Sequence, residues 1–304
     1  MLLNDPPPSL GEQVLGQMEH TITAHEKFMV CLSRGSGKTS WVECATLFAI
    51  ATGRQKYVVV VSANQRASSN ILKDIWRAVN EKDTPFSQDY PEIAMPFNIA
   101  NGSFRRRQLF RGISTDLEKN SSELVFARLK DENGKEMPTS GSVISCRGVT
   151  SGIRGLKRGN LRPSYVILDD IMTAQDARSP EAVEKLMEAI NKDIIPLSGK
   201  ERLSILQTAT PIAPDDLVEK IKQDNSWRTT IFPAVISFPK NKLLWEQYFN
   251  MWDEENVQKT GHVQSLDFYK AHRGEMDEGS EVFNPMRYSE KDGHISAIQK
   301  LLEL

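Results

Sequence analysis

The 304-residue sequence predicts an α/β protein with a central, mainly parallel β-sheet flanked by helices, plus a small C-terminal helical or linker region. Two observations predict this fold class. Short runs rich in Val and Ile alternate with segments of helical periodicity, which is typical of βαβ units. In addition, a loop with two glycines, within residues 32–39, joins an apolar run to a helix-like segment.

The loop at residues 32–39 has the composition of a phosphate-binding loop. It reads Leu-Ser-Arg-Gly-Ser-Gly-Lys-Thr, and it lies between an apolar run at 28–31 and a helix-like stretch at 40–48. Gly35 and Gly37 allow the backbone to turn sharply, so that successive N–H groups can converge on a phosphate. The order of buried strand, small-residue loop and helix N-terminus therefore predicts nucleotide binding.

Two side chains at the end of this loop add the expected chemistry. Lys38 supplies a positive charge for the β- and γ-phosphate oxygens, and the Thr39 hydroxyl can bind Mg²⁺. The first glycine of the G-x-x-x-x-G-K-[ST] pattern is replaced by Leu32. The alternative interpretation is a chance Gly-Lys-Thr at a helix start. The residues that we expect to contact the nucleotide are Ser33, Arg34, Gly35, Ser36, Gly37, Lys38, Thr39 and Ser40.

The other expected elements follow in chain order. We expect strands at 57–62, 123–129, 142–146, 165–168, 203–206 and 229–232, the last being the final strand. A helix is expected over 64–79, and Asn133-Gly134 indicates a hairpin turn. Ser179 and Pro180 indicate a helix start, because a hydroxyl at the N-cap and a proline at the first helical position both favour one. Residues 214–216 open another helix.

The sequence changes character near residue 238, and we place domains at 1–238 and 239–304. Residues 243–279 are helical and polar. We expect the aromatic stripe of this part to pack against the sheet domain rather than to stack on bases. The stripe consists of Trp245, Tyr248, Phe249 and Trp252. Residues 281–304 resemble a connection and a short helix, not a closed domain.

Composition and charge limit the function classes. With 39% hydrophobic and 26% charged residues the chain is an ordinary globular protein, and its apolar run at 58–61 is far too short to span a bilayer. Three cysteines without metal-like spacing favour reduced thiols in a cytosolic setting. A net charge of −2 gives no global attraction to nucleic acid, so DNA contact needs local basic patches.

Two basic clusters are candidates for such patches. Residues 137–168 contain no acidic residue, and a second cluster is formed by Arg105–Arg107 with Arg111. A solvated basic loop is the alternative interpretation of either cluster. The residues of the first cluster that we expect to contact DNA are Lys157, Arg158 and Arg162.

Two aspartates follow the predicted strand at 165–168. A carboxylate at the carboxyl end of a buried strand beside the loop strand is what a magnesium–nucleotide site requires. We expect Asp169 to bind Mg²⁺, directly or through water, and Asp170 to orient or deprotonate the attacking water. The alternative is that both are turn or cap residues, which are common at strand ends.

The next strand ends in Thr208, Ala209 and Thr210, followed by a proline. A small hydroxyl tripeptide in this place can sense the γ-phosphate, although it can also be an ordinary strand end.

Arginines are expected near the γ-phosphate, because phosphoryl transfer spreads negative charge over its oxygens. Arg34 lies inside the loop, and Arg154 lies on a glycine-flanked segment, with Arg158 as a near equivalent. DNA contact or a surface role are the alternatives for Arg154.

Taken in order, four motifs resemble the ATPase domain of the large terminase subunit, the genome-packaging motor of tailed bacteriophages. They are residues 33–39, 152–155, 166–170 and 208–211. The resemblance covers roughly residues 10 to 235, and a P-loop without its first glycine is typical of that family. It implies a P-loop ATPase of the ASCE (additional-strand) type that forms a pentameric ring on the procapsid portal. The ring would pump double-stranded DNA with ATP and Mg²⁺.

The same resemblance implies roles for individual residues and partners. Asp170 takes the catalytic carboxylate position, and Thr208 to Thr210 form the coupling motif. Arg34 is implied to be a same-subunit sensor of the γ-phosphate, and Arg154 a finger that reaches the neighbouring subunit's ATP. The adenine-contacting glutamine is Gln13 or Gln17. Portal protein and a small terminase subunit are the implied protein partners, in the cytoplasm of an infected bacterium, with no membrane partner.

The sequence departs from the terminase pattern in two features, and two other functions are alternatives to a packaging motor. Many relatives have Glu at the position of Asp170, and the family's nuclease domain has no counterpart in residues 211–304, so we expect no DNA cleavage by this chain. A helicase-like DNA translocase of superfamily 2 needs a second RecA-like domain, for which residues 211–304 are short. A non-hydrolysing, ATP-dependent assembly module is the other alternative, and it would bind ATP without releasing phosphate.

Overall fold

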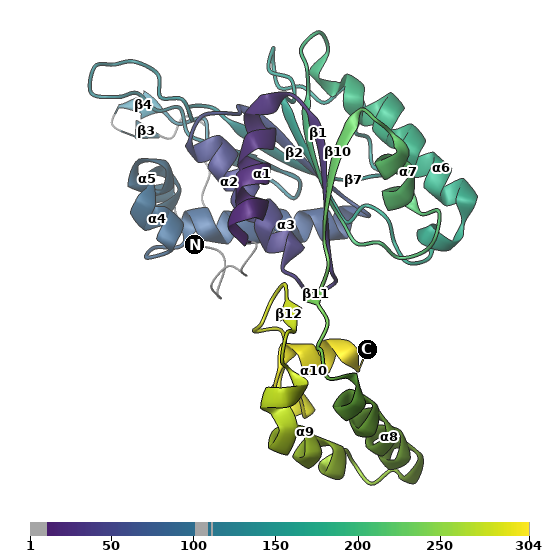
Figure 1. The fold of residues 1–304 in the computed structure, drawn as a ribbon. Coiled ribbons are helices and arrows are strands. Elements are labelled where there is room, and N and C mark those ends of the chain that lie inside the picture. Colours follow the sequence, from purple (N-terminus) through teal and green to yellow (C-terminus); the bar gives the residue numbers. More distant parts are fainter. Residues whose placement is uncertain (1–10, 101–108, 111, 304) are drawn as a thin grey trace. The chain divides into compact units, whose positions relative to one another are not determined.

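The computed structural model describes residues 11–100, 109–110 and 112–303, and Figure 1 shows its fold. The chain divides into two compact units. Among the described residues, one unit comprises Gln13–Ile231 with the large sheet, and the other comprises residues 11–12 and 232–303. The boundary after residue 238 that the sequence suggests stays a prediction. The basic segment at 105–107 and Arg111 lie outside the described residues.

The first unit is built on an eight-stranded sheet with the order β10-β1-β9-β8-β2-β7-β6-β5. Its strands are β1 (Lys27–Leu32), β2 (Tyr57–Ser62), β5 (Glu118–Lys119), β6 (Glu123–Val125), β7 (Val143–Gly148), β8 (Tyr165–Asp169), β9 (Ser204–Ala209) and β10 (Trp227–Phe232). The pairs β1–β9, β9–β8, β8–β2 and β2–β7 are parallel, whereas β5–β6 and β6–β7 are antiparallel. The predicted α/β class with a mainly parallel sheet is confirmed.

One detail of the strand order differs from the expectation. The strand that carries the two aspartates, β8, is not beside the loop strand β1, because β9 lies between them. The parallel register nevertheless pairs Asp169 on β8 with Thr208 on β9. The carboxyl ends of β1, β9 and β8 therefore meet at one edge of the sheet, where ligands of open α/β sheets bind.

Helices cover both faces of this sheet (Figure 1). They are α1 (Gly11–Ala24), α2 (Lys38–Ala51), α3 (Gln65–Asn80), α4 (Pro85–Asp89), α5 (Pro91–Ala100), α6 (Pro180–Ala189) and α7 (Leu217–Gln223). Alternate residues of the strands, such as Met29, Val59 and Val166, pack with apolar residues of α6 and α7. The helices α2 and α3 contact β2. Successive side chains of a strand point to opposite faces of the sheet, and helices cover both faces. The central strands therefore have apolar side chains on both faces.

Capping explains where several helices begin. Asn64, Ser179 and Asp216 each accept hydrogen bonds from backbone N–H groups of the first turn of α3, α6 and α7, respectively. The predicted start at Ser179 and Pro180 is confirmed. The helix expected from 214–216 begins at Leu217, because Asp216 is its N-cap rather than a helical residue.

The remaining short elements of this unit are mostly turns and hairpins. They are β3 (Leu109–Phe110), β4 (Ile113–Ser114), the 3-10 helices η1 (Asp176–Arg178) and η3 (Ile195–Ser198), and the π-helical segment η2 (Ile190–Ile194). The predicted strand at 123–129 ends earlier, at Val125. The turn at Asn133-Gly134 is present, and the Gly134 N–H donates to the Asp131 carbonyl.

The second unit has its own hydrophobic core. It contains α8 (Lys242–Gln258), α9 (Val263–Met276), α10 (Ala297–Leu302), the 3-10 helix η4 (Glu290–Asp292), and the antiparallel pair β11 (Val235–Ser237) and β12 (Glu281–Val282). One expectation is therefore wrong: 229–232 is not the final strand, because β11 and β12 follow it. The expected connection and short helix after residue 281 are present as the segment with η4 and as α10.

The aromatic stripe on α8 packs inside this second unit, which corrects the expected packing on the sheet domain. Trp245 and Tyr248 lie against Tyr269 and Met276 of α9, and Trp245 Nε1 donates to the Met276 carbonyl at 2.7 Å. The partner residues are few and lie on a polar helix, so the sequence pattern of α8 alone did not reveal them. No helix among the described residues is long and apolar enough to cross a membrane.

The carboxyl end of β7 is held tightly to the start of α3. The Gln65 side chain donates to the Cys146 carbonyl and accepts from the Gly148 N–H, both at 3.1 Å. A Cβ atom at Gly148 would lie only 2.5 Å from the Gln65 nitrogen. Such a contact forces backbone to move, because neither partner is a flexible side-chain end.

We predict that Gly148→Ala lowers the free energy of unfolding by about 1–3 kcal/mol, because overpacking displaces the α3 N-terminus. Urea unfolding followed by circular dichroism measures the change. Gly152→Ala is the matched control, since a Cβ there meets nothing within 4 Å. Equal stability of the two variants would contradict the close approach.

Candidate nucleotide site

The loop after β1 folds as a tight turn that ends at the N-terminus of α2. Gly35 and Gly37 both have φ near 77°, a backbone conformation that only glycine adopts without strain. Gly37 is the N-cap of α2. The Ser36 N–H donates to the Ser33 carbonyl, and Trp41 Nε1 of α2 donates to the Ser36 carbonyl at 3.2 Å. The turn is thus closed on both sides by hydrogen bonds.

Lys38 is the buried cation of the site. Its side chain is 6% exposed, and Nζ donates to Thr210 Oγ1 at 2.6 Å. The same Nζ is 3.3 Å from the Ser33 carbonyl oxygen and 3.4 Å from Asp170 Oδ2. Burying an ammonium group is costly unless it is paired, and these oxygens provide the pairing. The loop and the ends of β8 and β9 therefore meet at Lys38.

Asp169 is held between two threonines from different elements. Thr39 Oγ1 of α2 donates to its Oδ2 at 3.2 Å, and Thr208 Oγ1 of β9 donates to its Oδ1 at 2.9 Å. Burial raises the pKa of Asp169, and the adjacent Asp170 charge adds to the rise, while the Thr208 and Thr39 hydroxyls and Lys38 oppose it. The carboxylate is fixed in place although its environment disfavours its charge.

Asp170 has a different environment from its neighbour. Its φ of 41° is unusual for a residue other than glycine, and its N–H donates to the Thr208 carbonyl. The side chain is 45% exposed. Burial raises its pKa, and Lys38 acts in the opposite direction. The left-handed backbone thus turns one aspartate outward while the other stays buried.

The residues present fit a nucleotide with a divalent cation. Ser36 Oγ in the loop and Ser62 Oγ, at the β2 position paired with Asp169, are buried and have no hydrogen-bond partner among the described residues. Within the same residues there is no group of three His, Cys, Asp or Glu side chains that could hold a metal alone. Mg²⁺ usually takes one or two protein ligands and completes its shell with water and phosphate oxygens. Thr39 and Asp169 match that requirement.

The arginines of the site lie in different environments. Arg34 is exposed in the loop. Arg154 is 74% exposed and forms an ion pair with Asp193 of η2. Arg158 is bound by Glu118 at 2.6 Å, and this contact raises its pKa. Arg158 is thus held at the antiparallel edge of the sheet, whereas Arg154 has a single ion pair, on the surface, within the described part of the chain.

The other predicted residues are placed as follows. Ser40 is half-buried in the first turn of α2, Ala209 is the buried last residue of β9, and Lys157 and Arg162 are exposed. Gln13 and Gln17 both line a groove of about 460 Å³ beside α1. Gln17 Oε1 is buried there without a hydrogen-bond partner among the described residues.

Sequence reasoning missed two acidic groups, one close to Asp169 and one bound to Arg154. Glu43 of α2 is buried, one helical turn beyond Thr39, and Asp193 binds Arg154. A charged residue at i+4 from Thr39 on the same helix face was a usable signal for Glu43. Nothing in the sequence indicates Asp193, because its contact with Arg154 depends on how η2 folds back.

Comparison with known proteins gives a structural likeness only. No family model and no curated protein sequence matches the chain. The fold resembles a phage terminase domain. The ATPase domain of the Thermus phage P74-26 large terminase aligns at a TM-score of 0.41 and 13% identity, over 90% of this chain and all of the other. A point mutant of that domain aligns at a TM-score of 0.42 and 13% identity, over 86% and 96% of the two chains.

The buried carboxyl group of Glu43 gives a pH-dependent prediction. Burial, with Asp74 and Asp169 adding to it, raises its pKa from 4.5 to about 7. Between these values the folded protein keeps a proton that the unfolded chain has lost. The contribution of Glu43 to stability therefore falls as the pH rises through this window.

We predict that Glu43→Gln removes this loss and stabilises the protein at pH 8 by an amount on the order of 2–3 kcal/mol, but not at pH 4.5. Urea unfolding at both pH values, without nucleotide or Mg²⁺, measures it. Exposed Glu184 provides the control Glu184→Gln. An identical pH slope in wild type and Glu43→Gln would contradict the prediction.

Proposed function

We propose that this chain is the ATP-hydrolysing motor domain of a bacteriophage DNA-packaging terminase. The observation that carries the ATPase part is the meeting of Lys38, Thr39, Asp169, Asp170 and Thr210 at one edge of the sheet. These residues come from three separate segments, and each has the chemistry that phosphoryl transfer requires. The motor part rests on the motif order in the sequence.

The residues have distinct tasks in this proposal. The loop N–H groups and Lys38 hold the phosphates, while Thr39 and Asp169 hold Mg²⁺. Bound ATP supplies the phosphoanhydride bond that is hydrolysed. Asp170, which faces outward from the buried pair, orients a water molecule and accepts a proton at its carboxylate. Because aspartate is shorter than glutamate, its reach depends on the left-handed turn that projects it from β8.

The hydrogen bond between Lys38 and Thr210 supports the coupling role of β9. Thr210 follows the end of this strand, and Thr208 on the same strand donates to Asp169. A change in the partners of Lys38 is therefore transmitted directly to a strand that is hydrogen-bonded to both β1 and β8. Two threonines, one on β9 and one directly after it, thus connect the proposed phosphate site and the proposed metal site.

The partners of the proposed motor follow from the sequence resemblance. They are double-stranded DNA, a portal protein, a small terminase subunit and further copies of this chain in a pentameric ring, in the cytoplasm of the infected host. Arg154 is the proposed finger, because its guanidinium is exposed and has one surface ion pair. Arg158 is disfavoured, because two carboxylates, Glu118 and Glu123, hold it. Gln17 is the proposed adenine contact, because its buried amide oxygen has no hydrogen-bond partner among the residues that the structure describes.

We predict that the full chain hydrolyses ATP with Mg²⁺ and that Asp170→Asn lowers kcat by about 10²- to 10⁴-fold, because the base is lost. Phosphate release in the presence of double-stranded DNA measures hydrolysis, and a fluorescent ATP analogue measures binding. Binding should stay within about threefold of wild type, since the amide keeps the shape of the carboxylate.

Lys38→Ala is the comparison variant, and it should lose binding and hydrolysis together. Tight ATP binding by wild type without phosphate release would favour the non-hydrolysing assembly module. Normal turnover by Asp170→Asn would remove Asp170 from its role.

We predict that Arg154→Ala lowers turnover in assembled rings by about 10³-fold or more, as for other arginine fingers. If Arg154 acts between subunits, mixing Arg154→Ala with Lys38→Ala protein should restore part of the turnover. Mixing Arg154→Ala with the Lys38→Ala/Arg154→Ala double variant is the control. Equal turnover in the two mixtures would indicate a same-subunit or DNA-contact role.

A further inference from the structure

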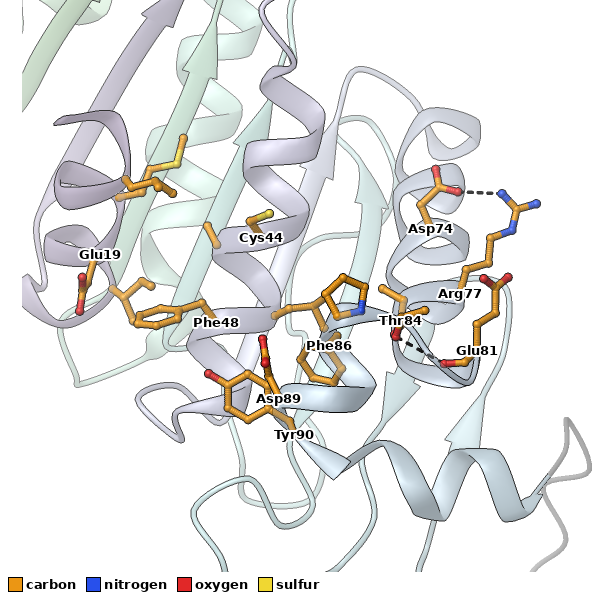
Figure 2. Close-up of a pocket in the computed structure, with 17 residues that line it drawn as sticks. Glu19, Cys44, Phe48, Asp74, Arg77, Glu81, Thr84, Phe86, Asp89 and Tyr90 are labelled. Atoms are coloured by element: carbon orange, nitrogen blue, oxygen red, sulfur yellow. Dashed lines mark hydrogen bonds and ion pairs between the residues drawn. The ribbon is translucent and has the colours of Figure 1, made fainter. Parts of the chain in front are cut away.

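A groove of about 920 Å³ lies between α1, α2, α3 and α4, and Figure 2 shows the residues that line it. It lies beside the middle and the C-terminal half of α2, whereas the nucleotide site lies at the N-terminus of that helix. No step of the proposed ATP chemistry uses it. All of its lining residues belong to the first unit.

The inner surface of the groove is mainly apolar. Met18 and Ile22 of α1 are buried at its base, and Phe48 of α2 and Phe86 of α4 are only partly covered. Leu15, one turn before Met18, is 37% exposed. Apolar side chains from three helices thus converge on one surface that the described part of the chain leaves accessible to solvent. A surface of this kind is typical of a docking site for another chain.

The charged residues of the groove are almost all acidic. Four carboxylates line it, and Arg77 is the single basic residue among the lining residues. The four acidic residues are Glu19, Asp74, Glu81 and Asp89. Asp74 is paired with Arg77, and Glu19 is paired with Arg54, whose guanidinium lies 4.9 Å from the centroid of the Phe48 ring. Glu81 and Asp89 are exposed, and neither has an ion pair among the described residues.

We propose that this groove docks a segment of a partner protein that presents apolar side chains on one side and Lys or Arg residues at its edges. Charge complementarity selects this occupant, because an acidic or neutral segment would leave the carboxylates at Glu81 and Asp89 without partners. A helix whose apolar face enters a groove and whose basic residues meet an acidic rim is a common recognition mode. The proposal does not depend on ATP hydrolysis.

The occupant would lie directly against α2. Cys44 and Phe48 line the groove, and Lys38 and Thr39 start the same helix. One helix therefore connects the docking surface to the phosphate loop. The partner segment is thus placed where it can be linked to the state of the nucleotide site.

The chain contains a built-in reporter for occupation of the groove. Cys44 is half-buried and lines it, whereas Cys31 and Cys146 are completely buried. Burial raises the pKa of both Cys31 and Cys146 to about 12, which suppresses their thiolate forms. N-ethylmaleimide should therefore modify Cys44 first in the folded protein, and intact-protein mass spectrometry follows the reaction.

We predict that a basic amphipathic peptide protects Cys44. The probe is a Leu/Lys helix of about 14 residues with apolar residues on one face. At a peptide concentration ten times its Kd, the modification rate should fall about elevenfold, because only the open groove reacts. A scrambled Leu/Lys peptide and a Leu/Glu peptide with the same periodicity are the controls, and neither should protect.

Variants of the acidic edge and of the apolar interior of the groove test whether the peptide protects Cys44 by binding there. Glu81→Lys combined with Asp89→Lys should raise the peptide concentration that gives half-maximal protection of Cys44 at least tenfold. Phe86→Ala should raise this concentration as well. Glu132→Lys combined with Glu184→Lys, which reverses two exposed acids outside the groove, should leave protection unchanged. Equal protection by the acidic peptide, or equal loss in both charge-reversal variants, would overturn the proposal. Protection that rises with protein concentration without peptide would instead identify a second copy as the occupant.

Discussion

The buried carboxylate of Asp169 is the point on which the candidate site depends. It is oriented by a hydroxyl from the start of α2 and by another from the end of β9, so three elements distant in sequence are tied to one side chain. This is possible because parallel strands end at the same edge of a sheet. The inserted strand β9 connects the loop to the acidic strand, because Thr208 on β9 donates to Asp169 and Thr210, directly after β9, accepts from Lys38. Two threonine side chains thus span the distance that the extra strand adds.

The charge balance at the carboxyl edge of the sheet, where β1, β9 and β8 end, explains why a cation fits there. Asp169, Asp170 and Glu43 all have a raised pKa, with burial as the largest cause, and Lys38 is the buried cation that partly offsets them. Two serine hydroxyls close to the same place have no partner among the described residues. A phosphate group with a divalent metal would satisfy the hydroxyls and lower the cost of the carboxylate charges together. The raised pKa values of the carboxyl groups and the unpaired hydroxyls therefore both indicate a phosphate ligand with a divalent cation.

The helix α2 contributes residues to two separate candidate binding sites. Its first turn forms the end of the proposed phosphate loop, and its later turns form one wall of an acidic, apolar groove. Most of the helix between these surfaces is buried, which gives it the rigidity needed to relate one end to the other. The second unit closes a core of its own around Tyr248 and Tyr269.

The sequence by itself determined the α/β class, the tight glycine turn after the first strand, the paired aspartates at a strand end and the starts of α3 and α6, because these depend on local turns, caps and apolar runs within a few residues. It could not determine that β9 separates β1 from β8, that Arg154 pairs with Asp193, or that the stripe on α8 packs on α9 rather than on the sheet. Only the tertiary structure decided these, together with the burial of Glu43 and the groove beside α2. The physical reason is that strand order, ion pairs and groove walls join residues far apart in the chain, and no local pattern records which of them meet.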